Sequence, residues 1–267
     1  MKKLNFLFIL FLLTSFITDA KHFEFTPLAT EAYQKAMSLR IEEAKKDISK
    51  IKREDPNNKI VYFIENYIDF FTVFINEDKS EFKKLEKNKY PRLKQIRKGD
   101  SNSPYYLYSQ AEIKLQWALA RLKFKQYLNA FNEVSDAYHL LKRNEKKFPD
   151  FVANKKSLGM LHAIIGTIPD KYKWGVKLLS GMTGNITQGK KEMEEILIYA
   201  QSHPFMFEEE TLVMYAFLVL HLKDDMESAW DIIQNKKLDP KTNPLVCFAL
   251  GNIALHTGKN DLAIEIL

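Results

Sequence analysis

LGNIALHTGKNDLAIEIL, residues 250–267, reads as two short amphipathic helices joined by a tight turn. Gly251 and Ala263 are small residues on the two helices, and they let antiparallel helices approach closely. Gly258 opens the turn Gly-Lys-Asn-Asp and is expected to end the first helix with a positive φ. This stretch therefore predicts a helical hairpin.

The same arrangement of small residues recurs upstream. Ala229 precedes Ala263 by 34 residues, and earlier copies run over residues 111–141 and 40–58. The copies are not evenly spaced, so extra length lies between them. We therefore expect one helical repeat domain over residues 21–267. Its predicted repeats lie near residues 25–58, 111–144, 210–243 and 244–267, with irregular stretches at 59–110 and 145–209.

Almost everything after Pro27 follows a three- and four-residue apolar spacing, broken by prolines at helix-length intervals. Strand-like alternation is not evident, so we expect an all-α fold. The repeat pattern resembles the tetratricopeptide repeat (TPR) family, with Gly251 and Ala263 at matching positions. It departs from the family at Cys247, where Trp is usual, and at Ala254, where Tyr is usual. The resemblance implies an α-α superhelix, a solenoid of antiparallel hairpins, with an irregular Gly-rich hairpin in the middle.

The first 20 residues have the layout of a cleaved secretory signal peptide. Two lysines follow Met1, an apolar run covers residues 6–17, and small residues precede the expected cut ahead of Lys21. No Cys stands at the cut, so a lipoprotein is not expected. The chain is also similar over most of its length to exported TPR proteins of Bacteroidota bacteria, a likeness that implies no known activity. These features predict export to the periplasm or cell envelope of a bacterium.

The sequence ends at Leu267, inside the expected second helix of the last hairpin. Leu262, Ile266 and Leu267 would then have no following helix to cover them, whereas solenoids need a polar terminal cap. We therefore expect either that the chain is a fragment or that this end packs on another chain.

Composition and motifs argue against several classes of function. The 46% of apolar and 28% of charged residues are typical of a folded protein, and the net charge of +6 is spread along the chain, so no nucleic-acid partner is expected. Cys247 is the only cysteine, and the six scattered histidines form no metal-binding motif. The acidic run at residues 208–210 is expected at a helix start, where it complements the helix dipole. No catalytic set emerges, so we expect no enzymatic activity, no metal and no cofactor.

In the TPR family the first helices of the hairpins line a concave groove that takes peptides or partner proteins. The resemblance therefore implies a non-catalytic scaffold that binds a protein or peptide partner. Carried over by the repeat frame, the residues expected to face this groove are Glu112, Leu115, Leu119, Lys123, Met214, Leu218, His221, Phe248, Asn252 and His256.

Generic repeats do not explain the segment 157–189. Six of the nine glycines of the chain fall in it. Because Gly in a helix costs about 1 kcal/mol relative to Ala, this density predicts close helix contact or special turns. A faint similarity to the fungal inclusion-body-clearance family of mitochondrial outer-membrane proteins, which is itself TPR-like, rests on Gly159, Pro169, Gly181, Gly184 and Gly189.

Three interpretations of this segment follow from the sequence. A basic amphipathic patch centred on Lys173, Trp174 and Lys177 would touch a membrane surface, which makes a membrane-associated envelope factor the alternative function. A turn at residues 181–184 would hold an anion on backbone N–H groups. An irregular hairpin with Trp174 capping the core would need no ligand. An enzyme with an unrecognised site is a further alternative.

Overall fold

The computed structural model of the protein describes residues 21–222, 227–234 and 238–267. Over these residues the chain is helical, and the one β contact is an isolated parallel bridge between His22 and Asn58. The all-α prediction is thus confirmed for the described part of the chain. The signal peptide predicted at residues 1–20 lies outside it. Every described helix is too short or too polar to span a bilayer.

Successive helices pair into hairpins at all four predicted repeats. In each pair the two helices pack against each other and are joined by a short connection. The pairs are α2 (Pro27–Met37) with α3 (Ile41–Glu54), α7 (Pro104–Lys123) with α8 (Tyr127–Lys147), α12 (Glu208–Leu220) with α13 (Ser228–Gln234), and α14 (Pro244–His256) with α15 (Asn260–Ile266).

The two stretches predicted to be irregular are helix pairs with an interruption. In the first, α4 (Ile60–Asn76) packs against α6 (Lys89–Ile96), which follows a short α5 (Lys79–Leu85) and a 3-10 helix η1 (Glu86–Asn88). In the second, α9 (Ala153–Thr167) packs along α11 (Ile186–Ala200), and α10 (Asp170–Ser180) is inserted between them. The extra length is therefore accommodated by additional short helices rather than by long loops.

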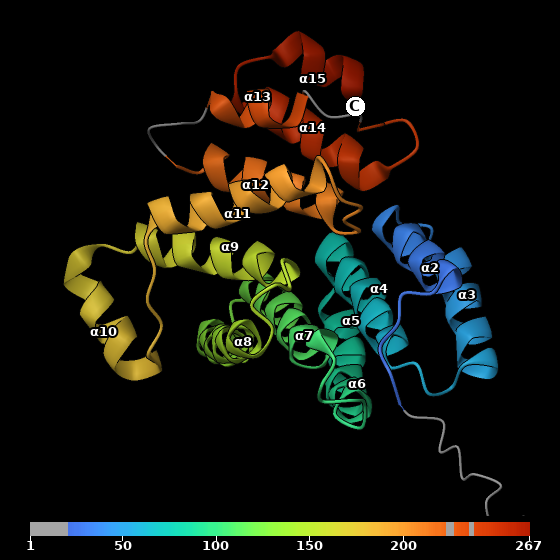
Figure 1. Cartoon of the computed structure of the whole chain (residues 1–267). Coiled ribbons are helices and arrows are strands. Elements are labelled where there is room, and N and C mark those ends of the chain that lie inside the picture. The colour runs from blue at the N-terminus through green and yellow to red at the C-terminus, as the bar shows by residue number, and fades with distance from the viewer. Residues whose placement is uncertain (1–20, 223–226, 235–237) are drawn as a thin grey trace, which may run out of the picture.

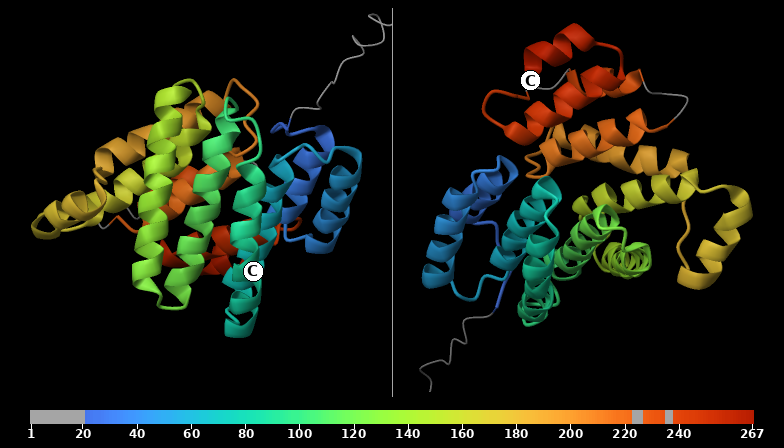
Figure 2. Two further views of the ribbon diagram at one scale, coloured as in Figure 1. Left: turned by 90° about the horizontal axis from the view of Figure 1, so that it is seen from below. Right: turned by 180° about the vertical axis from the view of Figure 1, so that it is seen from behind.

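The hairpins follow one another along a winding path. In Figure 1 the chain runs from the α2/α3 pair through α4–α6 to the α7/α8 pair. The helices α9, α11 and α12 then run across the view above them, and α13–α15 form the top layer. Seen from below, α7 and α8 stand side by side (Figure 2). The helix α10 projects sideways from the stack, at the left edge of Figure 1.

Three of the hairpin turns share one backbone geometry. The residue after the first helix has a φ of −96°, −94° or −97° in the α2/α3, α7/α8 and α14/α15 turns, respectively. The next residue has a positive φ, 57° at Leu39, 58° at Lys125 and 76° at Gly258. In each turn the following N–H donates to the carbonyl oxygen five residues earlier, at an N–O distance of 2.9 Å. The prediction of a positive φ at Gly258 is confirmed, and the same turn forms where no glycine is present.

The ends of two second helices also match. Asp55 after α3 has φ −139° and ψ 70°, and Phe148 after α8 has φ −134° and ψ 71°. Each donates its N–H to the carbonyl four residues earlier at 2.7 Å, and each precedes a proline, Pro56 or Pro149. Because a residue before proline avoids the helical conformation, the proline ends the helix at the same point in both copies.

Small and aromatic side chains fill the core. Ala44, Ala130, Ala229 and Ala263 are all buried where paired helices meet, as the repeat frame predicts. The largest apolar cluster lies where the first helices converge. It contains the edge-to-face rings of Phe25, Tyr33, Phe63, Tyr67 and Phe207, from the N-terminal segment, α2, α4 and the residue before α12.

Candidate functional site

The ten residues predicted to face a concave groove fall into two separate groups. Four lie on α7, and six lie on α12, at its C-terminal end or on α14. The helix α7 packs mainly on α4 and α8, whereas α14 packs on α12 and α15. Leu119, Lys123, His221, Phe248 and His256 are exposed, and Leu115, Met214 and Asn252 are half-buried.

Glu112 and Leu218 are buried, so neither faces an open groove. Leu218 belongs to the apolar core between α12 and α14. Glu112 lies in a polar cluster at the middle of the molecule, where its charge has partners that the sequence pattern did not indicate.

This polar cluster is built around two carboxylates and one amine. The Lys156 Nζ lies 2.9 Å from Glu112 Oε2 and 3.0 Å from Glu210 Oε1. The hydroxyls of Tyr33 and Tyr67 each donate to the Glu210 carboxylate at 3.0 Å. We call these five residues the ionic clamp. Because they come from α2, α4, α7, α9 and α12, the clamp joins the first hairpins to the C-terminal part of the chain.

Burial and the two carboxylates set the charge state of the ionic clamp. Burial by itself lowers the pKa of Lys156, but Glu112 and Glu210 outweigh it, so the pKa is raised and the amine stays protonated. Burial, followed by Glu210, raises the pKa of Tyr33 and Tyr67 well above the ordinary value, so both hydroxyls remain donors. Burial also raises the pKa of Glu112, although Lys156 opposes it.

The surroundings of the ionic clamp close it off from solvent. The Lys156 side chain has no exposed surface, and its Nζ lies 5.2 Å from the ring centre of Phe207 and 5.8 Å from that of Tyr108. The Ser157 hydroxyl donates to Glu112. Paired charges that are enclosed by aromatic rings in this way favour the one helix arrangement that brings them together.

The predicted membrane patch lies on α10. Trp174 and Lys177 are exposed, whereas Lys173 is half-buried and pairs with Asp170 at 2.9 Å. On the opposite side of the helix Val176 packs against the main core. The interpretation that Trp174 caps the core is therefore wrong, because the helix turns Val176 inward and Trp174 outward.

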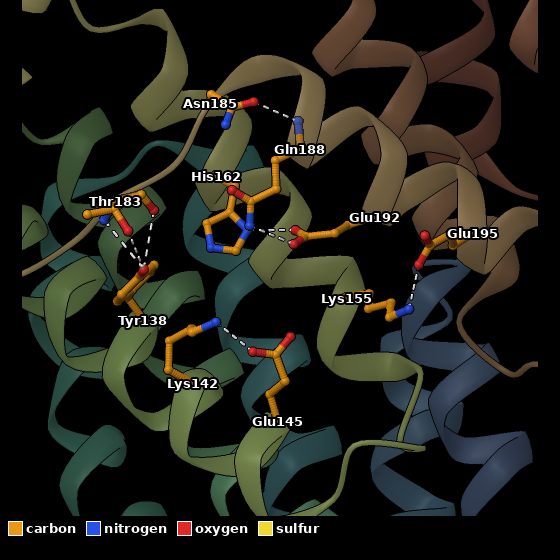
Figure 3. A network of polar contacts seen from close by, with 10 residues as sticks. All are labelled: Tyr138, Lys142, Glu145, Lys155, His162, Thr183, Asn185, Gln188, Glu192 and Glu195. Carbon is orange, nitrogen blue, oxygen red and sulfur yellow. Dashed lines mark hydrogen bonds and ion pairs between the residues drawn. The ribbon is translucent and has the colours of Figure 1, made fainter.

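The C-terminal end of α10 is fixed to the rest of the molecule. His139 Nε2 lies 2.7 Å from the carbonyl oxygen of Ser180, and the Tyr138 hydroxyl donates to the carbonyl of Thr183 at 3.2 Å. Figure 3 shows Tyr138 and Thr183 beside a second group, in which His162 Nδ1 lies 2.6 Å from Glu192 Oε2. The first two contacts tie the end of α10 and the segment after it to α8, and the third ties α9 to α11.

Most backbone N–H groups of the turn at residues 181–184 donate within the chain. The Met182 N–H donates to the Ser180 hydroxyl and the Thr183 N–H to the Tyr138 hydroxyl, each at 3.4 Å. Met182 itself is buried in the main core. The Gly181 N–H donates to the carbonyl oxygen of Lys177 at 2.8 Å. Three of the four N–H groups of the turn thus have partners within the chain, which disfavours the interpretation of this turn as an anion site.

The glycines of this region allow close approach of backbone to backbone. A Cβ on Gly184 would lie 2.5 Å from the Cα of His162. On α11, a Cβ on Gly189 would collide with the carbonyl oxygen of Gly159 on α9. The prediction of close helix contact is thus confirmed for these three residues, and it explains why α9 and α11 pack along each other despite the inserted α10.

Other chemistry is sparse in the described part of the chain. Its described residues hold no group of three or more His, Cys, Asp or Glu side chains placed to bind a metal. Cys247 is half-buried, and its Sγ donates to the carbonyl oxygen of Ile266 at 3.2 Å. No family model, no curated protein and no solved structure matches this chain. The site must therefore be interpreted from its own geometry.

The sequence interpretation did not identify four members of the ionic clamp, namely Tyr33, Tyr67, Lys156 and Glu210. Each of these residues lies in a stretch whose sequence pattern is already explained by helix formation or by core packing. Glu210 lies in the acidic first turn of α12, as the dipole argument predicts, and it is also turned toward the core. The one available signal was the pair of tyrosines, Tyr33 in the first predicted repeat and Tyr67 in an aromatic-rich stretch, whose hydroxyls need acceptors when they are buried.

Proposed function

We propose that the protein is a non-catalytic helical-repeat scaffold of the TPR type, exported to the bacterial cell envelope, where it binds a protein or peptide partner. The surface proposed for the partner is the exposed side of α14 that carries Phe248, Asn252 and His256, together with His221 at the end of α12. We call these four residues the partner face.

The repeated turns support a TPR-like superhelix. Helical repeats are built from one supersecondary unit whose copies stack on their neighbours. Here three turns share the same backbone angles and hydrogen bonds, and two second helices end with the same angles before a proline. A geometry repeated where the sequence differs, as at Leu39, Lys125 and Gly258, is what a common unit requires.

The exposure of the α14 residues carries the partner proposal. Phe248, Asn252 and His256 follow one another at four-residue steps, so they lie along one side of the helix. Phe248 is 57% exposed, so its ring is available for contact with a partner. An aromatic ring flanked by an amide and an imidazole suits a peptide, because the ring provides apolar contact and the polar groups provide hydrogen bonds.

Contacts between neighbouring helices keep the partner face in place. The side chain of Asn243 caps the start of α14 and also donates to Glu209 on α12 at 2.7 Å. Leu218 and Leu250 pack in the core beneath. The face is therefore a rigid side of two packed helices, which lowers the entropic cost of binding a partner.

Site-specific photocrosslinking in the native envelope tests this function. A photoreactive amino acid replaces Phe248 in one strain and the exposed Leu128 on α8 in a control strain. We expect an adduct with one partner from position 248 and none from position 128. The affinity of the purified partner should then fall at least about tenfold for Asn252→Arg, since a large charge is inserted into the contact.

Two results would contradict the proposal. One is the absence of any adduct from position 248 when the protein is present at its native level. The other is an identified partner whose affinity is the same for the natural chain and for Asn252→Arg.

A further inference from the structure

The helix α10 exposes several large apolar side chains to solvent. Tyr172, Trp174, Leu178 and Leu179 are 58%, 68%, 74% and 81% exposed. Scattered exposed leucines are ordinary, but this 11-residue helix carries four large exposed apolar side chains. Trp174 and Leu178, four residues apart, lie along one side, and Tyr172 and Leu179, seven residues apart, lie along another. We call these four residues the α10 face.

The rest of the chain holds α10 so that this face stays uncovered. Val176 turns toward the core and Ser180 is buried, so the opposite side of the helix faces the molecule. The contacts of Ser180 with His139 and of Thr183 with Tyr138 fix the C-terminal end. An isolated helix of this length is marginal in water, so these anchors maintain the helix before any ligand binds.

The charges on α10 indicate what covers the face. Lys171, Lys173 and Lys177 stand on this helix against a single acid, Asp170, which pairs with Lys173 at 2.9 Å. Lys171 and Lys177 therefore have no acidic partner on their own helix. Long lysine side chains beside an apolar face extend their amines outward to a polar layer while their stems contact apolar material. This combination of Trp, Leu and Lys is typical of helices that lie in a lipid headgroup layer.

We propose that α10 is a peripheral membrane anchor that inserts the α10 face into an anionic phospholipid surface. Trp174, Leu178 and Leu179 enter the boundary between headgroups and acyl chains, and Lys171 and Lys177 contact the lipid phosphates. The charge complementarity between the lysines and anionic headgroups selects this occupant over a neutral membrane. The anchor is separate from the partner face on α12 and α14, so each proposal can fail without the other.

Vesicle flotation of the processed chain, residues 21–267, tests the anchor. Vesicles of phosphatidylcholine with phosphatidylglycerol are compared with vesicles of phosphatidylcholine alone. We expect the protein to float with the mixed vesicles, to stay behind with the neutral vesicles, and to be released as salt is raised. The double variant Trp174→Glu/Leu178→Glu should lower the partition coefficient at least about tenfold, because both side chains leave the apolar layer.

A matched control places the same two charges elsewhere. Leu255 and Ile264 are 52% and 77% exposed on α14 and α15, in the top layer of Figure 1 and far from α10. Leu255→Glu/Ile264→Glu should float as the natural chain does. A second variant, Lys171→Gln/Lys177→Gln, leaves the α10 face intact and should still weaken binding to the mixed vesicles. Circular dichroism of every variant must match the natural chain for the comparison to count.

Several outcomes would overturn the proposal. The natural chain could fail to float with anionic vesicles, or the α10 double variant could float equally well. Equal flotation with neutral vesicles would refute the role of the lysines. Concentration-dependent dimerisation in the absence of lipid, lost in Trp174→Glu/Leu178→Glu, would show that a second copy of the chain covers the face instead.

Discussion

At the scale of single residues, the hydrogen bonds of the hairpin turns demand a positive φ, whatever side chain occupies the position. Leu39 and Lys125 adopt it as Gly258 does. A residue with a Cβ costs about 1–2 kcal/mol in this conformation, whereas glycine adopts it freely. Two of the three turns therefore carry a local cost that the packing of their helices offsets.

Exchanging these residues should change stability in opposite directions. Lys125→Gly should raise the free energy of unfolding by about 0.5–1 kcal/mol, because it relieves the φ of 58°. Gly258→Ala should lower it by about 1 kcal/mol, and the cause is conformational, since a Cβ there meets no atom within 4 Å. Urea denaturation of both variants measures the effects, and a shift of the same sign in both would contradict the shared turn geometry.

At the scale of elements, the α9/α11 contact depends on glycine and the projecting α10 does not. The backbone of α11 approaches α9 so closely at Gly189 that no side chain fits between them. Gly175 on α10 has open space around it, with no atom within 4 Å of a Cβ placed there. Glycine is therefore required for helix packing at Gly189 on α11, whereas Gly175 on α10 makes no close contact.

Alanine substitutions at Gly189 and Gly175 test this difference. Gly189→Ala should lower the free energy of unfolding by about 1–3 kcal/mol, because the added methyl group forces the helices apart. Gly175→Ala should leave global stability unchanged or raise it by up to about 1 kcal/mol, since alanine favours the helix and meets nothing. Thermal unfolding followed by circular dichroism compares them, and equal stability of the two variants would show that the close contact is not required.

At the scale of the whole molecule, the ionic clamp is the point where distant parts of the chain converge. The amine of Lys156 on α9 lies between carboxylates of α7 and α12, and Glu210 also receives hydroxyls from α2 and α4. Buried charges contribute little net stability when paired, but they penalise any arrangement that leaves one of them alone. The clamp therefore selects one packing of the hairpins over others.

The raised pKa of Glu112 predicts a pH dependence of stability. A carboxyl whose pKa is higher in the folded than in the unfolded state destabilises the fold above the folded-state pKa. That penalty disappears as the pH falls toward the ordinary Glu pKa of 4.5. On acidification from neutral pH, the natural chain should therefore gain stability relative to Glu112→Gln. Urea denaturation of both proteins at a series of pH values measures this difference, and parallel curves would disprove it.

The sequence predicted the hairpins because their causes are local. Small residues such as Ala130 and Ala263 and the prolines at helix ends mark where helices pack and stop. The ionic clamp was missed because its causes are distant. Lys156 and Glu210 carry side chains that are normally exposed, and only their meeting across several helices reveals that they are buried.

The exposure of individual side chains could likewise be predicted only where it depends on their own helix and not on distant helices. Trp174 was singled out from its local pattern and Phe248 by the repeat frame, and both are exposed. The repeat frame assigned Glu112 to an open groove. A repeat position predicts which side of its helix a side chain lies on, but it does not predict which other helices pack against that side. The side chains of Lys156 on α9 and Glu210 on α12 lie on that side of α7, so Glu112 is enclosed.

The clamp also bears on how the polypeptide is made. Tyr33 and Tyr67 donate to Glu210 across 177 and 143 residues of sequence. On a chain growing from its N-terminus, both tyrosines leave the ribosome long before their acceptor is synthesised, and water must serve their hydroxyls in the interval. The two hydroxyls thus exchange water for a protein acceptor only when α12 packs against the earliest helices.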